Sequence, residues 1–149
     1  MSYTAYTDGG SSPNPGAGGW GVYWVVGDDI QNGEEFYGSE QHTTNNKMEL
    51  TAVIQALRIL EDKGGNKLQI VLDSEYVLKN FNERLDGWIA RDWRLASGEP
   101  VKNKELWEEL RERAQKVDII WKWTKGHAGD FGNEKADELV GKGREEASQ

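Results

Sequence analysis

The 149-residue chain contains no cysteine and only two histidines. The absence of cysteine excludes a disulfide framework, a thiolate zinc site and a cysteine nucleophile. Two histidines are too few for a zinc cage built mainly from imidazole ligands. No apolar run approaches the roughly 18 residues that a membrane span needs, and Met1 to Gly10 lacks the pattern of an export signal. We therefore expect a cytoplasmic protein without a membrane partner.

Positive charge is scarce as well. The chain has 18 Lys and Arg against 26 Asp and Glu, a net charge of −8. Because phosphate contacts need Lys and Arg, this balance excludes a general affinity for polyanions, and any nucleic acid must be bound locally. The length suits one domain over residues 1–149. We expect an ordered core over about 3–140 and a frayed tail over 141–149, where glycine and polar residues dominate.

The apolar pattern predicts a meander of strands followed by alternating helices and strands. Strands are expected at 3–7, 20–26, 34–38, 67–72 and 119–123, the first of them ending in a turn at Asp8-Gly9-Gly10. Helices are expected from Asn46 to the glycines at 64–65, from Ser74 to about Phe81, and over 103–117 and 133–140. This order predicts an α/β fold, a five-stranded mixed sheet with three antiparallel strands first and helices on its flanks.

Four carboxylates fall where side chains from different elements can converge. Asp8 and Asp73 each follow a predicted strand, and they stand side by side if those two strands are neighbours. Glu49 and Asp137 would reach the same place from helices. Such a cluster stays ionised near neutral pH only with cations, because like charges raise one another's pKa values. Ligands that are all oxygen favour a hard divalent ion such as Mg²⁺.

Each of these carboxylates also has a purely structural interpretation. Asp8 could form a turn with the glycines that follow it. Glu49 could complete a capping box with Asn46, and Asp73 could cap the helix that starts at the next residue. Asp137 could be one more solvated charge on a helix. Taken singly, the four positions leave these alternatives open.

Five sequence blocks together carry a more specific pattern. They are Tyr6-Thr7-Asp8-Gly9-Gly10-Ser11, Thr43-Thr44-Asn45-Asn46-Lys47-Met48-Glu49-Leu50, Leu72-Asp73-Ser74-Glu75-Tyr76-Val77, Trp123-Thr124-Lys125-Gly126-His127-Ala128-Gly129 and Asn133-Glu134-Lys135-Ala136-Asp137-Glu138-Leu139. In their residues and in their order along the chain, these blocks resemble type 1 ribonuclease H, the bacterial ribonuclease HI family, over about residues 3–140. The resemblance implies a ribonuclease H-like fold. It also implies hydrolysis of the RNA strand of an RNA/DNA hybrid, with 5′-phosphate and 3′-hydroxyl products.

The resemblance assigns catalytic roles to residues already singled out. It implies that Asp8, Glu49, Asp73 and Asp137 hold two Mg²⁺ ions, for which Mn²⁺ could substitute, in a two-metal displacement. Asp8 would bridge both ions, Asp137 would serve the ion that activates water, and the other two carboxylates would serve the leaving-group side. The family's mobile-loop histidine falls on His127, which would move protons or help the product depart. Its structural alternative is an ordinary surface-loop histidine.

The resemblance also assigns contacts with the hybrid. Contacts to the 2′-hydroxyl, the group that marks the RNA strand, fall on Gly9, Ser11, Asn14, Asn45 and Glu75. Glu75 departs from the glutamine that is common in the family, and a carboxylate can accept a hydrogen bond but cannot donate one. Contacts to the DNA strand fall on Thr44, Asn46 and Trp88, although Trp88 could equally be a core residue. The hybrid is the expected partner, no obligate protein partner is evident, and a monomer is expected.

Two functions of other classes are weighed against this one. The same fold could be a catalytically idle hybrid-binding module, because fold alone never proves activity. It could also be a ribonuclease H-like nuclease acting on DNA. The presence of four carboxylates and His127 speaks against the idle module, and the block at 43–50 with the Gly-His loop favours the hybrid nuclease. Residues 88–103, where many bacterial members carry a basic protrusion, have three basic and two acidic side chains, which predicts weak binding.

Overall fold

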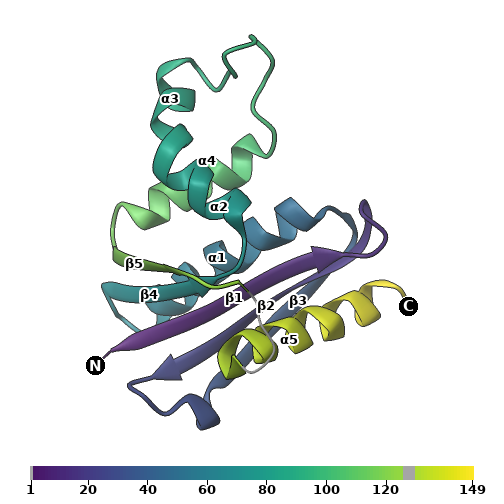
Figure 1. Cartoon of the computed structure of the whole chain (residues 1–149), viewed down its shortest axis with the longest axis vertical. Coiled ribbons are helices and arrows are strands. Elements are labelled where there is room, and N and C mark those ends of the chain that lie inside the picture. The colour runs from purple at the N-terminus through teal and green to yellow at the C-terminus, as the bar shows by residue number, and fades with distance from the viewer. Residues whose placement is uncertain (1, 126–129) are drawn as a thin grey trace.

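The computed structural model describes residues 2–125 and 130–149 and contains a five-stranded sheet with helices on both faces (Figure 1). The sheet order is β3-β2-β1-β4-β5. The strands are β1 (Tyr3–Ser11), β2 (Gly16–Val26), β3 (Glu34–Thr43), β4 (Lys67–Leu72) and β5 (Asp118–Trp123). β1, β2 and β3 pair antiparallel, whereas β4 runs parallel to β1 and β5 parallel to β4. The predicted mixed sheet with three antiparallel strands first is confirmed.

Helices cover the two faces unequally. α1 (Asn45–Asp62) packs on β1, β2 and β4, and α4 (Lys104–Ala114) packs on α1. α5 (Phe131–Ala147) lies across β1, β2 and β3 on the opposite face. After β4 the chain forms α2 (Glu75–Lys79), a π-helical turn η2 (Asn80–Arg84) and α3 (Leu85–Ala90), while a short 3₁₀ turn η1 (Ile30–Asn32) joins β2 to β3. Figure 1 shows α3 and the segment that follows it projecting away from the sheet.

The larger part of the core lies under α1. Its fully buried side chains include Leu50, Leu57, Ile70, Leu72 and Trp107, which come from α1, β4 and α4. The apolar residues of α1 recur at three- and four-residue steps, so one stripe of the helix faces the sheet. Within the described residues, we find no helix that combines the length and the apolar character needed to cross a membrane.

The caps at the N-termini of α1 and α2 test the capping roles that the sequence left open for Glu49 and Asp73. Thr44, rather than Asn46, caps α1, because its side-chain oxygen accepts the Lys47 N–H at 3.2 Å. Ser74, rather than Asp73, caps α2 by accepting the Val77 N–H at 3.2 Å. The capping interpretations of Glu49 and Asp73 are therefore wrong, because neighbouring hydroxyls satisfy these helix ends.

The glycine-rich segment 9–21 is mostly strand, so the predicted turn at Asp8-Gly9-Gly10 is wrong. β1 continues to Ser11, and Asp8 lies inside the strand opposite Gly21 rather than in a turn. The glycines permit close packing of helices instead. A Cβ on Gly9 would collide with the backbone of α1, and a Cβ on Gly21 would collide with the backbone of α5.

Residues 141–147 continue α5, so the predicted frayed tail is wrong. Val140, Gly143 and Ala147 are buried in this last part of the helix. Gly143 lies against Gly19 of β2 and the carbonyl group of Gly38 in β3, where no side chain would fit. These glycines let α5 lie close to the sheet along its whole length, and that packing orders the segment.

Substitutions at two neighbouring glycines of α5 test this packing. We expect Gly143→Ala to lower the free energy of unfolding by about 1–3 kcal/mol, because its methyl group would overlap the Gly38 carbonyl group. Gly141→Ala is the matched control, since the space around Gly141 is open. It should raise stability by roughly 0.5–1 kcal/mol through helix propensity. Urea unfolding of both variants measures the difference, and equal effects would contradict the close approach of α5.

Candidate active site

Three carboxyl groups meet where the β1–β4 pair ends. The parallel register aligns Tyr6 with Val71, so Asp8 and Asp73 occupy equivalent places two residues further along. Glu49 reaches the same place from the first turns of α1. Each of the three side chains offers an oxygen that lies within 4.8 Å of the other two. The predicted neighbourhood of the two strands and the convergence of these three residues are confirmed.

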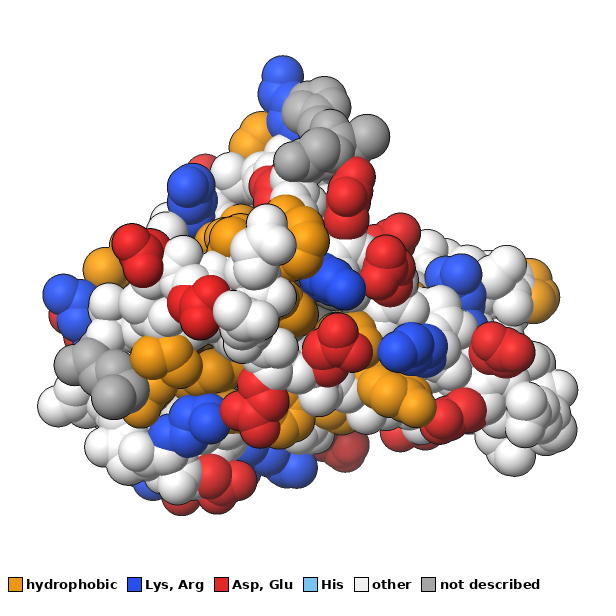
Figure 2. Space-filling model, turned by 90° about the horizontal axis from the view of Figure 1, so that it is seen from below, with side chains coloured by type: hydrophobic (Ala, Val, Ile, Leu, Met, Phe, Trp, Pro, Cys, Tyr) orange, Lys and Arg blue, Asp and Glu red, His pale blue; other side chains and the backbone are white. Residues whose placement is uncertain are grey.

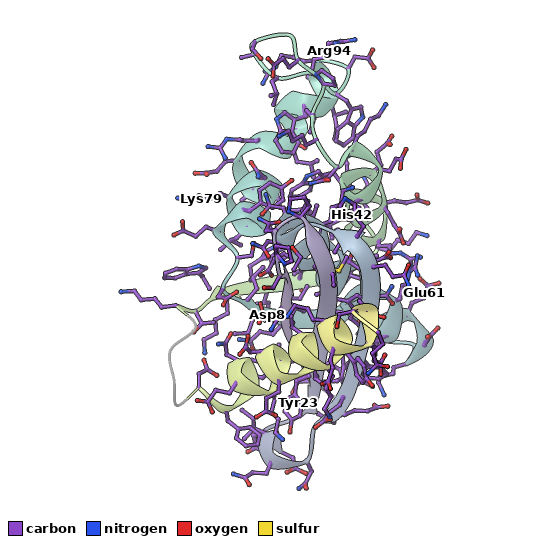
Figure 3. The ribbon with its side chains drawn as sticks, turned by 90° about the vertical axis from the view of Figure 1, so that its right-hand side faces the viewer. Asp8, Tyr23, His42, Glu61, Lys79 and Arg94 are labelled. Carbon is purple, nitrogen blue, oxygen red and sulfur yellow. The ribbon has the colours of Figure 1, made fainter. Side chains whose placement is uncertain are left out.

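Gly9 explains how a helix and a strand deliver adjacent carboxylates. Any side chain at this position would strike the backbone at Met48 and Glu49, so glycine allows the first turns of α1 to rest on β1. The Gly9 N–H also donates to Oδ1 of Asp8 at 2.9 Å, which orients that carboxylate. Asp8 is buried, and Figure 3 shows it near the middle of the molecule, above α5 in that view.

The cluster is electrostatically unfavourable without a cation. Burial, and next the charge of Asp73, raise the pKa of Asp8 from 3.8 to about 7. Burial, and next the charge of Asp8, raise the pKa of Glu49 well above its usual range. The pKa of Asp73 is also raised, mainly by burial. The three groups therefore cannot all be ionised near neutral pH unless positive charge is brought among them.

Asp137 stands beside this group of three rather than within it. It is an exposed residue of α5 and does not belong to the set whose oxygens lie within 4.8 Å of one another. Its charge nevertheless raises the pKa of both Asp8 and Asp73, so it acts on the cluster from the α5 side. His127, the fifth predicted catalytic residue, lies outside the described residues.

The donor set fits a hard divalent cation. All three side chains offer carboxylate oxygen, the ligand type that Mg²⁺ takes, usually together with water. In the part of the chain that the structure describes, no other group of His, Asp and Glu converges in this way. The raised pKa values give a physical reason for metal binding, because a cation would relieve the repulsion among these carboxylates.

Three of the predicted substrate contacts form one hydrogen-bonded network at the end of the β1–β2 hairpin. The Ser11 N–H donates to Oδ1 of Asn45 at 2.8 Å. Oδ1 of Asn14 accepts from the Asn45 N–H and from the Ser11 hydroxyl, each at 3.1 Å. Both asparagine side chains are exposed, so their remaining polar groups can meet a ligand.

The other predicted contacts divide by exposure. Asn46 and Glu75 are exposed, and Glu75 lies 3.8 Å from Nζ of Lys79 across one helical turn. Trp88 is only 6% exposed, and its ring packs edge-on against Trp107 with 5.5 Å between centroids. Its position therefore favours the core alternative over contact with a substrate, because its surface is already covered by protein.

Sequence reasoning did not identify Asp130, which links the start of α5 to the catalytic end of the sheet. One carboxylate oxygen of Asp130 accepts the Asn133 N–H at 3.2 Å and caps α5, while the other accepts from the Thr124 hydroxyl at 3.3 Å. The Thr124 N–H in turn donates to the carbonyl of Leu72 at 2.9 Å. The available signal was an Asp directly before the first residue of the helix, Phe131.

Charge is mixed rather than separated on one face of the molecule (Figure 2). On the face shown in Figure 2, acidic and basic side chains are interspersed, and neither sign gathers in a large patch. This distribution agrees with the net charge of −8 and with binding through local contacts.

Comparisons with known proteins agree with this geometry. The family model described as RNase H matches residues 1–145. The chain is 49% identical over 142 residues to the ribonuclease H of Hahella chejuensis (strain KCTC 2396), covering 95% of this chain and 93% of the relative.

Two solved structures show the same fold. The crystal structure of LC9-RNase H1, described as a type 1 RNase H with the type 2 active-site motif, superposes with a TM-score of 0.81 at 28% identity, over 97% of this chain and 72% of that one. LC11-RNase H1 in complex with an RNA/DNA hybrid superposes with a TM-score of 0.73, over 99% of each chain. At 24% identity, this second likeness shows the fold alone.

Proposed function

The chain belongs to the ribonuclease H family and is a ribonuclease H acting on RNA/DNA hybrids, and from this premise we propose that Asp8, Glu49, Asp73 and Asp137 form its metal-dependent active site. The observation that carries the proposal is the convergence of three carboxyl oxygens within 4.8 Å, from β1, α1 and β4. Asp137 is included in the proposed site because its charge raises the pKa of Asp8 and of Asp73. The convergence of the three carboxylates needs no second copy of the chain, and a monomer is the proposed active unit.

The carboxylates have distinct places in this proposal. By resemblance to the family, Asp8 would be the ligand shared by two Mg²⁺ ions, and its carboxyl group interacts with those of Glu49, Asp73 and Asp137. Glu49 and Asp73 would hold the ion on the leaving-group side, and Asp137 would hold the ion that acidifies the attacking water, as the family resemblance implies. Bound Mg²⁺, or Mn²⁺ in its place, supplies an acidified water and neutralises the charge on phosphate and on the leaving oxygen. The products are a 5′-phosphate and a 3′-hydroxyl.

Polar groups beside the cluster would select the RNA strand. A 2′-hydroxyl is both a donor and an acceptor, and the network of Ser11, Asn14 and Asn45 offers groups of both kinds. The backbone of Gly9, next to Asp8, is a further candidate for contact with the RNA strand. The carboxylate of Glu75 can accept a hydrogen bond from a 2′-hydroxyl but cannot donate one. Thr44 and Asn46 at the start of α1 are the candidates for the DNA strand.

Two further parts of the proposal also rest on the family. His127 would carry protons or assist product release. The cytoplasm, where RNA/DNA hybrids form in bacteria, is the proposed location.

A comparison of four substrates tests the proposal. Labelled RNA/DNA hybrid, double-stranded DNA, double-stranded RNA and single-stranded RNA are each incubated with Mg²⁺ or with chelator. We expect cleavage of the RNA strand of the hybrid, only with Mg²⁺. Cleavage confined to DNA would support the alternative of a DNA-directed nuclease, and binding without cleavage would support an idle hybrid-binding module.

A further inference from the structure

Arg144 lies on α5 near the carboxylate cluster. It follows Asp137 by seven residues, so the two side chains leave the same face of the helix about 10 Å apart along its axis. Its Nη1 lies 3.8 Å from the point that a Cβ on Gly10 would occupy. Because Gly10 follows Asp8 by two residues in β1, that point is on the same face of the sheet as Asp8, about 7 Å further along the strand.

Packing of α5 holds the backbone of Arg144 in place. Its nitrogen lies 2.8 Å from the position of a Cβ on Gly19, in the same contact that seats Gly143 on the sheet. The Arg144 side chain is half-buried. A side chain that starts from a fixed backbone and is partly enclosed loses less entropy when it binds a ligand.

Among the described residues, Arg144 has no acidic partner, whereas several other cations have one. Arg58, Arg113 and Lys142 all lie within 4.0 Å of a carboxylate. Across residues 2–125 and 130–149, Arg144 makes neither a salt bridge nor a side-chain hydrogen bond. It faces a shallow hollow of about 350 Å³, lined also by Ser12, Ala17, Gly141, Glu145 and Ser148. Glu145 is the acidic residue of that hollow, and it does not pair with Arg144.

We infer that Arg144 binds a phosphate of the cleaved strand, one or two nucleotides away from the scissile phosphodiester. The inference rests on the proposed active site, which places the scissile phosphate at the carboxylates. Because a strand winds around the duplex, its neighbouring phosphates are about 6–7 Å apart in space although they rise only about 3.4 Å along the axis, so 7–10 Å corresponds to one or two phosphates. A guanidinium suits this ligand, because its planar donors match two phosphate oxygens. The Asn45 amide, whose Oδ1 lies 3.6 Å from the same Gly10 point, adds a polar group beside it.

Steady-state cleavage of a hybrid by three variants tests the role of Arg144. We expect Arg144→Ala to raise KM by about fivefold to tenfold, to leave kcat within about twofold, and to reduce the log–log salt slope by about 0.9. Arg144→Lys should keep the slope and recover part of KM, since it keeps the charge but loses the planar fork. Lys142→Ala is the matched control on the same helix, because Lys142 lies 3.8 Å from Glu35, and it should behave like the unmutated protein. Circular dichroism checks that each variant is folded.

Hybrids with a single methylphosphonate linkage locate the contact. Neutralising the phosphate that Arg144 binds should raise KM for the unmutated protein and leave KM for Arg144→Ala unchanged. If the variant and the unmutated protein share KM and salt slope while both cleave the hybrid, the inference is overturned and the active site stands. If neither the unmutated protein nor Lys142→Ala cleaves the hybrid, the proposed active site fails instead.

Discussion

Asp73→Asn is expected to reduce hybrid cleavage in Mg²⁺ by about a thousandfold or more. The substitution removes one carboxylate from the three whose oxygens lie within 4.8 Å, and it changes the side-chain volume little. Metal-assisted stabilisation contributes several kcal/mol to such a reaction, and each 1.36 kcal/mol is about tenfold in rate. The loss should fall on kcat, measured with labelled hybrid at saturating concentration. Hybrid binding in a gel-shift experiment should change by less than about threefold, since the polar contacts beside the cluster are retained.

Asp118→Asn provides the matched control for this experiment. Asp118 is exposed and begins β5, where it pairs in register with Lys67 at the end of the sheet opposite to Asp73. The same loss of charge at that end should leave kcat unchanged. Turnover of Asp73→Asn within tenfold of the unmutated protein would show that the carboxylate cluster is not the active site.

Asp8→Asn is expected to make the metal-free protein more stable at pH 8, by on the order of 2–4 kcal/mol. In the folded protein the pKa of Asp8 is raised from 3.8 to about 7, first by burial and then by the charge of Asp73. Between these two pH values the native state keeps a proton that the unfolded chain has lost. The free energy of unfolding therefore falls as pH rises from about 4 to about 7, and the full cost is present above pH 7. Asparagine cannot ionise and avoids this cost.

Thermal unfolding at pH 4, 6 and 8 in chelator measures the effect of Asp8→Asn. The gain in stability should be smallest at pH 4, where Asp8 of the unmutated protein is protonated in the folded state. Added Mg²⁺ should stabilise the unmutated protein more than the variant, because it binds only the folded site and its ligand set is then complete. Asp118→Asn should show no gain that grows with pH. A stability difference that is the same at all three pH values would contradict the raised pKa of Asp8.

Some features of this protein follow from local sequence alone. The order of strands and helices could be predicted because strand and helix periodicities are properties of short segments. α1 shows this, with apolar residues at helical spacing from Met48 to Leu60. The four carboxylates could be selected from their places beside predicted elements and from the family's motifs. Asp8 and Asp73 met as expected, because parallel neighbours bring the same ends of their strands together.

Other features could not be predicted because they depend on which distant backbone approaches a residue. Trp88 could have faced a substrate or the core, and Trp107, from a helix later in the chain, covers it. The capping box suggested for Glu49 and the helix cap suggested for Asp73 were plausible by spacing, yet the hydroxyl groups of Thr44 and Ser74 accept the hydrogen bonds at these helix ends. In each case the sequence allowed several partners, and the packing of other elements selected one.

The glycines show this division most clearly. Composition alone indicates a turn at Gly9 and a frayed end at Gly143, because glycine is the residue of turns and flexible ends. In the folded protein, the backbone of α1 packs directly on Gly9. Gly143 lets α5 pack directly on Gly19 and Gly38 of the sheet. The sequence by itself determined the elements and the acidic residues of the site. Only the tertiary structure decided how closely the helices lie on the sheet. The reason is that the absence of a side chain at a glycine matters only where another segment of backbone packs into the space that the side chain would fill.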